Sequence, residues 1–271
     1  MKFSSLSLLH TSKSGLNLVS VQCQNIPMQF LLDTGADHSR IYIDSLQKLD
    51  GIVDLEHPTI PSLMIGNHEW NDVHFKVNHG ENQSISRFGI HADGILGTDI
   101  LNGKCWIFHR PEKILHIYDS EHPEFLSWTQ SAEHFIPLHT HLLAGSSNHV
   151  WGCTGYLNGH GPIHINIDTG AQRTILTTKA GEFLDPKSKR QPITLSNGGD
   201  VNQAPSYRTT AEEIRLGKLV FPNPTVAVCD PIFSVAPELL DQPAILLGID
   251  VFGEFSYALD LQNGGMWFSS K

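Results

Sequence analysis

Several common features are missing from this sequence of 271 residues, and each absence excludes a class of protein. There is no run of lysine or arginine, and the formal net charge is −10. This charge argues against nucleic acid or an anionic membrane as the partner. No apolar segment approaches the length of a membrane span, and the N-terminal segment 1–15 is too short and too polar for a signal-peptide core. We therefore expect a cytoplasmic protein.

Cysteine pairs and metal-binding histidine patterns are also missing. The four cysteines stand far apart, at Cys23, Cys105, Cys153 and Cys229. Such spacing favours free, mostly buried thiols in a reducing compartment, with two disulfides as the less favoured alternative. None of the 16 histidines belongs to an HExxH pattern. We expect neither a metal site nor any other cofactor.

The composition that remains is typical of a protein built from short β-strands. Only 17% of the residues are charged, and the chain contains 23 glycines and 15 prolines. Turn-forming Asn-Gly pairs recur at 158–159, 197–198 and 263–264. Frequent turn signals between short apolar runs predict a β-rich fold.

One four-residue motif, Asp-Thr-Gly-Ala, occurs twice, at 33–36 and 168–171, each time after an apolar run. Three further landmarks follow in the same order in both halves, and such repetition is the first thing to test in a sequence. They are an apolar-Gly turn with a strand (from 63 and 214), the sequences ILGTD at 95–99 and LLGID at 246–250, and a closing strand pair (from 105 and 255).

The spacing between these landmarks supports two copies of one β unit. Gly66 lies 31 residues before Gly97, and Gly217 lies 31 residues before Gly248. The interval from the Asp-Thr-Gly-Ala motif to the apolar-Gly turn is 33 residues in the first half and 49 in the second. The second copy therefore carries one additional block, which lies between its Asp-Thr-Gly-Ala motif and its apolar-Gly turn.

Local patterns predict the remaining elements. Apolar runs predict strands that lead directly into both Asp-Thr-Gly-Ala turns. Short helices are predicted at Ile43–Leu49, at Lys179–Leu184 and around Asp99 and Asp250, whose carboxylates we expect to act as N-caps. The segment 119–134 has no clear period, and we interpret it as the connection between the two halves.

Two such turns can carry out chemistry that one cannot. On pseudo-symmetric halves, their carboxylates can face each other across the axis, where they share one proton and titrate as a unit. The ionised group can then act as general base on a water while the protonated group polarises a carbonyl. The alternative is that Asp33 and Asp168 are ordinary β-turn aspartates. The strands and the four repeated landmarks favour the paired arrangement.

The two motifs, together with ILG and LLG, resemble the pepsin–retropepsin group of aspartic proteases, most closely its retropepsin-like branch. The resemblance covers about residues 3–118 and 135–268. It implies an all-β, acid-protease-like fold: two pseudo-symmetric β-barrel lobes with a shared interlobe sheet and an active-site cleft between them. We expect lobes at 1–120 and 135–271, joined by a linker at 121–134, in a chain that is active as a monomer.

The resemblance also assigns roles to the residues of both motifs. The aspartates would be the catalytic dyad, the threonines would cross-brace the two turns, and the glycines would admit the substrate backbone. These residues are Asp33, Thr34, Gly35 and Ala36 in the first half and Asp168, Thr169, Gly170 and Ala171 in the second.

The next residue differs between the halves. Asp37 matches the retroviral-type position that touches the substrate main chain, and Gln172 stands at the same place in the second half. The resemblance therefore implies an asymmetric contact with a peptide or protein substrate that is bound in extended form.

The additional block in the second half predicts a β-hairpin. Residues 189–209 read as a strand, an Asn-Gly-Gly-Asp turn and a strand. In the family, a hairpin at this place is the flap that closes over substrate, so we expect a single flap, on the second lobe. Gly198 and Gly199 would form its tip, and Tyr207 is a candidate substrate contact.

Three functions remain open from the sequence. The first is a general aspartic endopeptidase. The second is a non-catalytic peptide-binding protein on the same fold, in which the cleft holds an extended chain by β-augmentation. The third is a dedicated protease that processes one partner or itself. Both aspartates and both threonines are present, which favours hydrolysis over binding alone.

Overall fold

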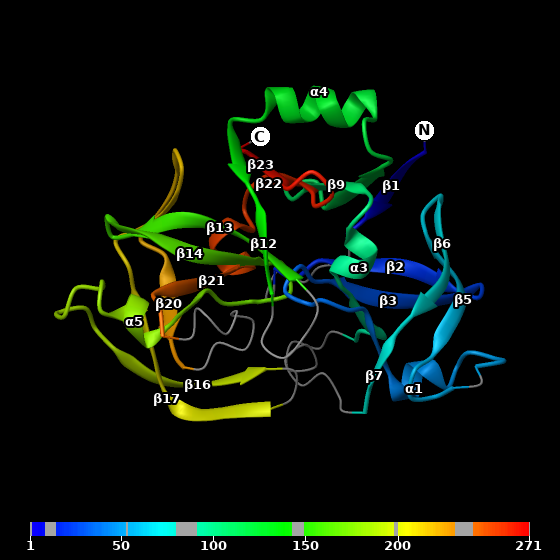
Figure 1. Cartoon of the computed structure of the whole chain (residues 1–271), viewed down its shortest axis with the longest axis horizontal. Coiled ribbons are helices and arrows are strands. Elements are labelled where there is room, and N and C mark those ends of the chain that lie inside the picture. Colours follow the sequence, from blue (N-terminus) through cyan, green and yellow to red (C-terminus); the bar gives the residue numbers. More distant parts are fainter. Residues whose placement is uncertain are drawn as a thin grey trace.

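The computed structural model describes residues 2–8, 15–52, 54–79, 91–142, 149–197, 200–230 and 241–270, and these form mostly β-sheet (Figure 1). Two strongly curled half-barrel sheets and one further sheet make up the architecture, so the predicted all-β, acid-protease-like fold is confirmed. None of the helices among the described residues combines the length and the apolar character that a membrane span requires.

The first half-barrel is a seven-stranded sheet in the order β6-β5-β2-β3-β8-β4-β7. Its strands and the two short helices beside it are β2 (Leu18–Cys23), β3 (Ile26–Leu32), β4 (Arg40–Tyr42), α1 (Ile43–Leu46), β5 (Thr59–Ile65), β6 (His68–His74), β7 (Lys76–Asn78), β8 (Gly94–Leu96) and α3 (Thr98–Leu101).

The second half-barrel is a ten-stranded sheet that lies opposite the first in Figure 1. Its elements are β12 (His139–Leu142), β13 (His149–Leu157), β14 (His160–Asp168), β15 (Ile175–Leu176), α5 (Thr178–Gly181), β16 (Gln191–Asn197), β17 (Asp200–Thr210), β18 (Glu213–Leu216), β19 (Leu219–Pro222), β20 (Thr225–Val228), β21 (Ala244–Gly248) and α6 (Ile249–Phe252).

The third sheet joins strands from both halves of the chain. It has six strands in the order β1-β10-β9-β22-β23-β11. They are β1 (Phe3–Ser7), β9 (Cys105–His109), β10 (Ile114–Tyr118), β11 (His134–Pro137), β22 (Ser256–Asp260) and β23 (Gly265–Ser269). The resemblance implies a shared sheet of this kind, and that expectation is confirmed, since strands from both halves pair in it.

The two central strands of this sheet, β9 and β22, pair symmetrically. Ile107 of β9 pairs with Ala258 of β22, and these two residues lie at equal distances from Gly97 and Gly248 in the sequence. The neighbouring pair, Trp106 with Leu259, is matched on the other side by Phe108 with Tyr257. The pairing of β9 with β22 is therefore symmetric about the Ile107–Ala258 pair.

One helix was not predicted. Helix α4 (Pro123–Ser131) lies over the six-stranded sheet (Figure 1), and its Phe125 is buried there, in a cluster with Ile107 and Ala258. The segment carries two helix-start signals, since His122 accepts a hydrogen bond from Glu124 N and proline occupies the first turn. Phe125 is the single buried residue of the helix, so there was no apolar period to detect.

The four cysteines are free and buried, as their spacing predicts. Burial raises the pKa of Cys23, Cys105 and Cys153 to about 12 in each case, with minor contributions from Asp93 at Cys23 and from Asp260 at Cys105. These thiols therefore pack as small apolar side chains and are not reactive thiolates.

A buried carboxylate ties together the first half-barrel. Asp93, which is 5% exposed, accepts hydrogen bonds from Ser45 Oγ at 2.6 Å, Lys48 Nζ at 2.8 Å and Gln29 N at 2.8 Å. Burial alone would raise its pKa, but these three donors outweigh burial and bring the pKa to about 2. The carboxylate therefore links β3 and α1 to the start of β8.

Replacement of this carboxylate should destabilise the protein in a pH-dependent way. Because the folded-state pKa of Asp93 lies below the usual value, its contribution is complete above about pH 4 and is lost as the pH falls toward 2. We expect Asp93→Asn to lower the free energy of unfolding by about 1–3 kcal/mol at pH 7, and by less at pH 3. Chemical denaturation at both pH values tests this, with the exposed Asp72→Asn as control; equal losses at both pH values would contradict it.

Candidate active site

Both Asp-Thr-Gly-Ala turns lie at the ends of strands that are paired in the same way. Asp33 follows β3, which pairs in parallel with β8, and Asp168 ends β14, which pairs in parallel with β21. The ILG and LLG sequences are the partner strands β8 and β21. Each turn is therefore supported by a parallel strand of its own half, β8, which ends directly before Gly97, or β21, which ends at Gly248.

Thr34 and Thr169 connect the two turns by four reciprocal hydrogen bonds. Thr34 Oγ1 donates to Ile167 O at 2.7 Å, and Thr169 Oγ1 donates to Leu32 O at 2.8 Å. Each hydroxyl oxygen also accepts the backbone N–H of the other threonine, at 3.1 Å in both directions. Both side chains are buried, and both hydroxyls use their donor and their acceptor capacity.

The two glycines bring each carboxylate against the opposite turn. A Cβ atom at Gly35 would overlap the carboxylate of Asp168, and a Cβ atom at Gly170 would overlap the carboxylate of Asp33. Since every other residue type carries a Cβ, only glycine permits this approach. Residues 135 positions apart in the sequence are thus brought into direct contact.

The carboxyl groups of Asp33 and Asp168 hydrogen-bond to each other. Burial is the largest cause that raises the pKa of both groups, and the charge of Asp33 raises the pKa of Asp168 further. The N–H groups of Gly170 and Ala171 donate to Asp168 Oδ1 at 2.9 and 2.8 Å, and Gly35 N donates to Asp33 Oδ1 at 2.8 Å. The pair therefore titrates as one unit and retains a proton at higher pH than separate aspartates would.

The surroundings of the pair are not symmetric. Asp168 is 7% exposed, whereas Asp33 is only partly buried. The positive charge of Arg40 lowers the pKa of Asp33 and so opposes the effect of burial there. Ile175 takes the place of Arg40 in the second half. This difference favours Asp33 as the ionised partner and Asp168 as the protonated partner.

Asp99 and Asp250 do not act as N-caps, which corrects the sequence-based expectation. The N-caps of α3 and α6 are Gly97 and Gly248, without a side-chain cap. Asp99 Oδ1 instead accepts from Ser39 Oγ at 2.7 Å, and Asp250 Oδ1 accepts from a residue at the equivalent position, Thr174, at 2.8 Å. Both aspartates lie in the first turn of their helix, and each carboxylate reaches across to the residue six positions after the motif aspartate of its half; Asp99 Oδ1 also accepts the N–H of Ile100 at 3.0 Å.

Ser39 and Thr174 are site residues that the sequence analysis missed. Each hydroxyl also accepts a backbone N–H, from Gly97 at 3.1 Å and from Gly248 at 3.0 Å. Both lie six positions after the motif aspartate of their half. Because a hydroxyl side chain recurs at this position in both halves, the sequence contained a signal for these residues. They attach each turn to its supporting strand.

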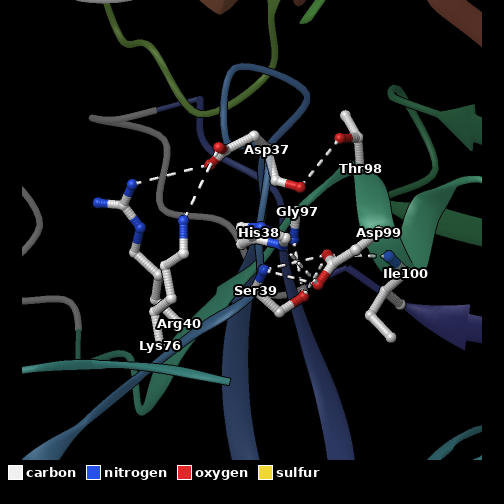
Figure 2. A network of polar contacts seen from close by, with 9 residues as sticks. All are labelled: Asp37, His38, Ser39, Arg40, Lys76, Gly97, Thr98, Asp99 and Ile100. Carbon is white, nitrogen blue, oxygen red and sulfur yellow. Dashed lines mark hydrogen bonds and ion pairs between the residues drawn. The ribbon is translucent and has the colours of Figure 1, made fainter. Parts of the chain in front are cut away.

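Asp37 lies beside the first turn within a network of polar contacts (Figure 2). Its carboxylate faces Arg40 and Lys76, with N–O distances of 4.0 and 3.9 Å, and its carbonyl accepts from Thr98 Oγ1 at 3.4 Å. The side chain is 7% exposed. Two cations therefore hold the carboxylate that the resemblance places against the substrate main chain.

Gln172, at the equivalent position of the second half, has different surroundings. Its Nε2 is buried and has no hydrogen-bond partner among the described residues. Ile175 supplies no counterpart to the Arg40 guanidinium. The first half thus places a carboxylate compensated by two cations directly after its motif, and the second half places there an amide whose buried Nε2 is unused.

An open pocket of about 310 Å³ lies next to Asp37. Both halves contribute to its wall, and the residues that line it are Asp37, His38, Thr98, Asp99, Asn102, Thr140 and Trp151. Among the described residues, no group of three or more histidine, cysteine, aspartate or glutamate side chains is placed to hold a metal ion.

The predicted hairpin at 189–209 is present as β16 and β17. The two strands pair from Gln191 with Arg208 to Asn197 with Asp200. The predicted tip, Gly198 and Gly199, lies outside the described residues. Tyr207 is at the base of the hairpin, where it pairs with Val228 and lies under the Arg190 guanidinium at 4.8 Å. Its observed contacts are packing contacts.

In the first half, the segment equivalent to the β16–β17 hairpin has a different structure. Between β4 and β5 the described residues form the short helix α1 and turns, without a strand. The additional block of the second half is therefore what forms the hairpin.

The hydrogen bonds that Thr34 and Thr169 form between the two turns, here called the threonine bridge, should contribute strongly to stability. Replacement of one hydroxyl leaves the N–H of the other threonine buried without an acceptor, so we expect Thr34→Val or Thr169→Val to lower the free energy of unfolding by about 1–3 kcal/mol each. Thr34→Ser, which keeps the hydroxyl, is the control and should lose less than half as much. Urea denaturation measures all three; a loss for Thr34→Ser equal to that for Thr34→Val would indicate that the methyl group matters and the bridge does not.

Comparison with known proteins agrees with this geometry for the second half of the chain. Residues 153–251 match the model of a protein family described as aspartyl protease. The matched region begins in β13, includes the Asp168 turn and the hairpin, and ends in α6. No curated protein matches the sequence. Residues 153–251 are therefore similar to the aspartyl protease family.

Proposed function

We propose that this protein is an aspartic endopeptidase that hydrolyses peptide bonds with Asp33 and Asp168 as its catalytic dyad. The observation that carries the proposal is the contact of each carboxylate with the glycine of the opposite turn, together with the raised pKa of both carboxyl groups. The family match supports peptidase activity for the second half. The equivalent first half supplies the other carboxylate.

The proposed mechanism uses one proton that the pair already shares. A water between the carboxyl groups loses a proton to the ionised aspartate as its oxygen attacks the carbonyl carbon of the scissile bond. The protonated aspartate gives its proton to the carbonyl oxygen, so a neutral tetrahedral diol forms. Proton transfer to the amide nitrogen then accompanies cleavage of the C–N bond. No covalent enzyme intermediate is required.

Asp33 is the better base and Asp168 the better acid in this scheme. Arg40 favours the charged form of Asp33, whereas burial and the charge of Asp33 favour the neutral form of Asp168. We assign these roles for the attack step only, since the shared proton moves from one carboxyl group to the other during turnover.

The substrate in this proposal is an extended peptide segment held between lobes at 1–120 and 135–271. Asp37 and Gln172 flank the dyad on the two sides, and the β16–β17 hairpin would cover the bound segment. The segment 121–134 connects the lobes, and we propose that one chain is sufficient for activity. The symmetric pairing of β9 with β22 supports an origin of the two lobes by internal duplication.

Loss of either aspartate should abolish cleavage. We expect Asp33→Asn and Asp168→Asn each to reduce the cleavage rate of a peptide library by at least about 1,000-fold, because general acid and base catalysis are both lost. The exposed Asp44→Asn serves as the matched acid-to-amide control, and pepstatin should inhibit the wild type. If no variant, including the wild type, cleaves but peptides bind, the protein is a peptide-binding module; if only one sequence is cleaved, it is a dedicated processing protease.

The pH dependence of cleavage should lie closer to neutral than in the pepsins. Pepsins commonly carry serine or threonine after the motif glycine, and its hydroxyl favours the charged carboxylate. Ala36 and Ala171 cannot donate a hydrogen bond from their side chains, so the pair should lose its proton at higher pH. A pH–rate profile tests this, and Ala171→Ser should shift it to lower pH. An optimum below about pH 3.5 for the wild type would contradict the expectation.

A further inference from the structure

Arg110 is a buried cation that belongs to neither of the two Asp-Thr-Gly-Ala turns. It follows β9 in the six-stranded sheet and is 9% exposed. Its Nη1 donates to Asn17 Oδ1, and its Nε donates to Gly253 O at 2.6 Å. Asn17 is fully buried and donates from Nδ2 to the hydroxyl of Tyr257 at 2.7 Å. The planar guanidinium thus binds two neutral acceptors that come from different halves of the chain.

One arm of this contact leads to the first aspartate turn. Asn17 O accepts the N–H of Leu32 at 2.9 Å, and Leu32 directly precedes Asp33. Leu32 O is also the acceptor for Thr169 Oγ1 at 2.8 Å. The position of Asn17 therefore fixes the backbone that carries Asp33 and one of the hydrogen bonds of the threonine bridge.

The other arm leads to the second aspartate turn. Gly253 ends α6, and its N–H donates to Ile249 O at 2.7 Å. Ile249 N donates to Ala171 O at 2.8 Å. Ala171 N in turn donates to Asp168 Oδ1 at 2.8 Å. Each arm is a short series of backbone hydrogen bonds between buried or partly buried residues.

The fold itself does not require an arginine here. In the second half, the position equivalent to Arg110 is Leu261, which is fully buried, and the position equivalent to Asn17 is Gly152. The second half therefore completes the same strand and turn with an apolar side chain. Among the described residues, no carboxylate pairs with Arg110, and burial lowers its pKa. A buried charge with neutral acceptors costs stability relative to leucine, which points to a role other than packing.

We propose that Arg110 is a positioning residue that holds the turns of Asp33 and Asp168 at a fixed separation. This inference rests on the proposed function, since the separation matters because the pair shares a proton. The guanidinium is suited to the task because its fork fixes two directions at once, whereas a lysine would have one movable donor group.

The test compares Arg110→Met with Leu261→Met, which places the same side chain at the equivalent position. Both variants are first shown to be folded by circular dichroism. For Arg110→Met we expect a 10- to 100-fold lower kcat with KM changed by less than about threefold, because small displacements of catalytic groups have effects of roughly this size. We also expect a shift in the pH–rate profile. Leu261→Met should leave kcat and the profile unchanged.

A second measurement does not depend on activity. NMR titration of ¹³C-labelled aspartate carboxyl groups follows Asp33 and Asp168 directly, and we expect Arg110→Met to change the titration of the pair while that of Asp93 stays the same. A folded Arg110→Met protein with lowered stability but an unchanged titration would overturn the inference, because that result is what a purely structural role predicts. If Arg110→Met does not fold, Arg110→Lys decides by the same titration.

The two proposals fail in different ways. If the wild type shows no cleavage of any peptide, but the titration of the pair changes in Arg110→Met, the proposed function fails and the positioning role stands. If the wild type cleaves and Asp33→Asn does not, but Arg110→Met matches the wild type in kcat, pH profile and titration, the positioning role fails and the proposed function stands.

Discussion

The structure depends on the reciprocal hydrogen bonding of Thr34 and Thr169. At the two turns, these side chains form hydrogen bonds from each half to the other, and both are buried. A hydroxyl that donates to one backbone carbonyl and accepts one N–H of the opposite half leaves no polar group unsatisfied. The contact also determines which side chains can follow it, since Gly35 and Gly170 must lack a Cβ. The proximity of the two carboxyl groups is a consequence of this bridge.

Much of the fold and of the site could be predicted because its signals are local and occur twice. An apolar run before Asp-Thr-Gly-Ala predicts a strand and a turn, and the second occurrence identifies the partner. The features that were missed depend on contacts between distant parts of the chain. Asp99 looks like an N-cap in its own segment, and only its contact with Ser39, 60 residues earlier, shows its role. Helix α4 buries one side chain, so its sequence carries no apolar period.

The two halves share a framework and differ at its edges. Equivalent hydroxyls, at Ser39 and Thr174, attach both turns to their supporting strands, and equivalent parallel strand pairs hold both aspartates. The differences lie in the residues that surround this framework, such as Asp37 against Gln172 and Arg110 against Leu261. A pair of identical acids in such surroundings is electrostatically unequal, so the two carboxyl groups can take different protonation states without any difference in their own chemistry.

The symmetric ladder between β9 and β22 has a consequence for assembly. Equivalent residues face one another across Ile107 and Ala258, which is the arrangement of an isologous interface between identical subunits. In this chain both strands belong to one polypeptide, and residues 110–255 connect them. Their association is therefore intramolecular, and dilution does not weaken it as it would weaken the association of two separate subunits.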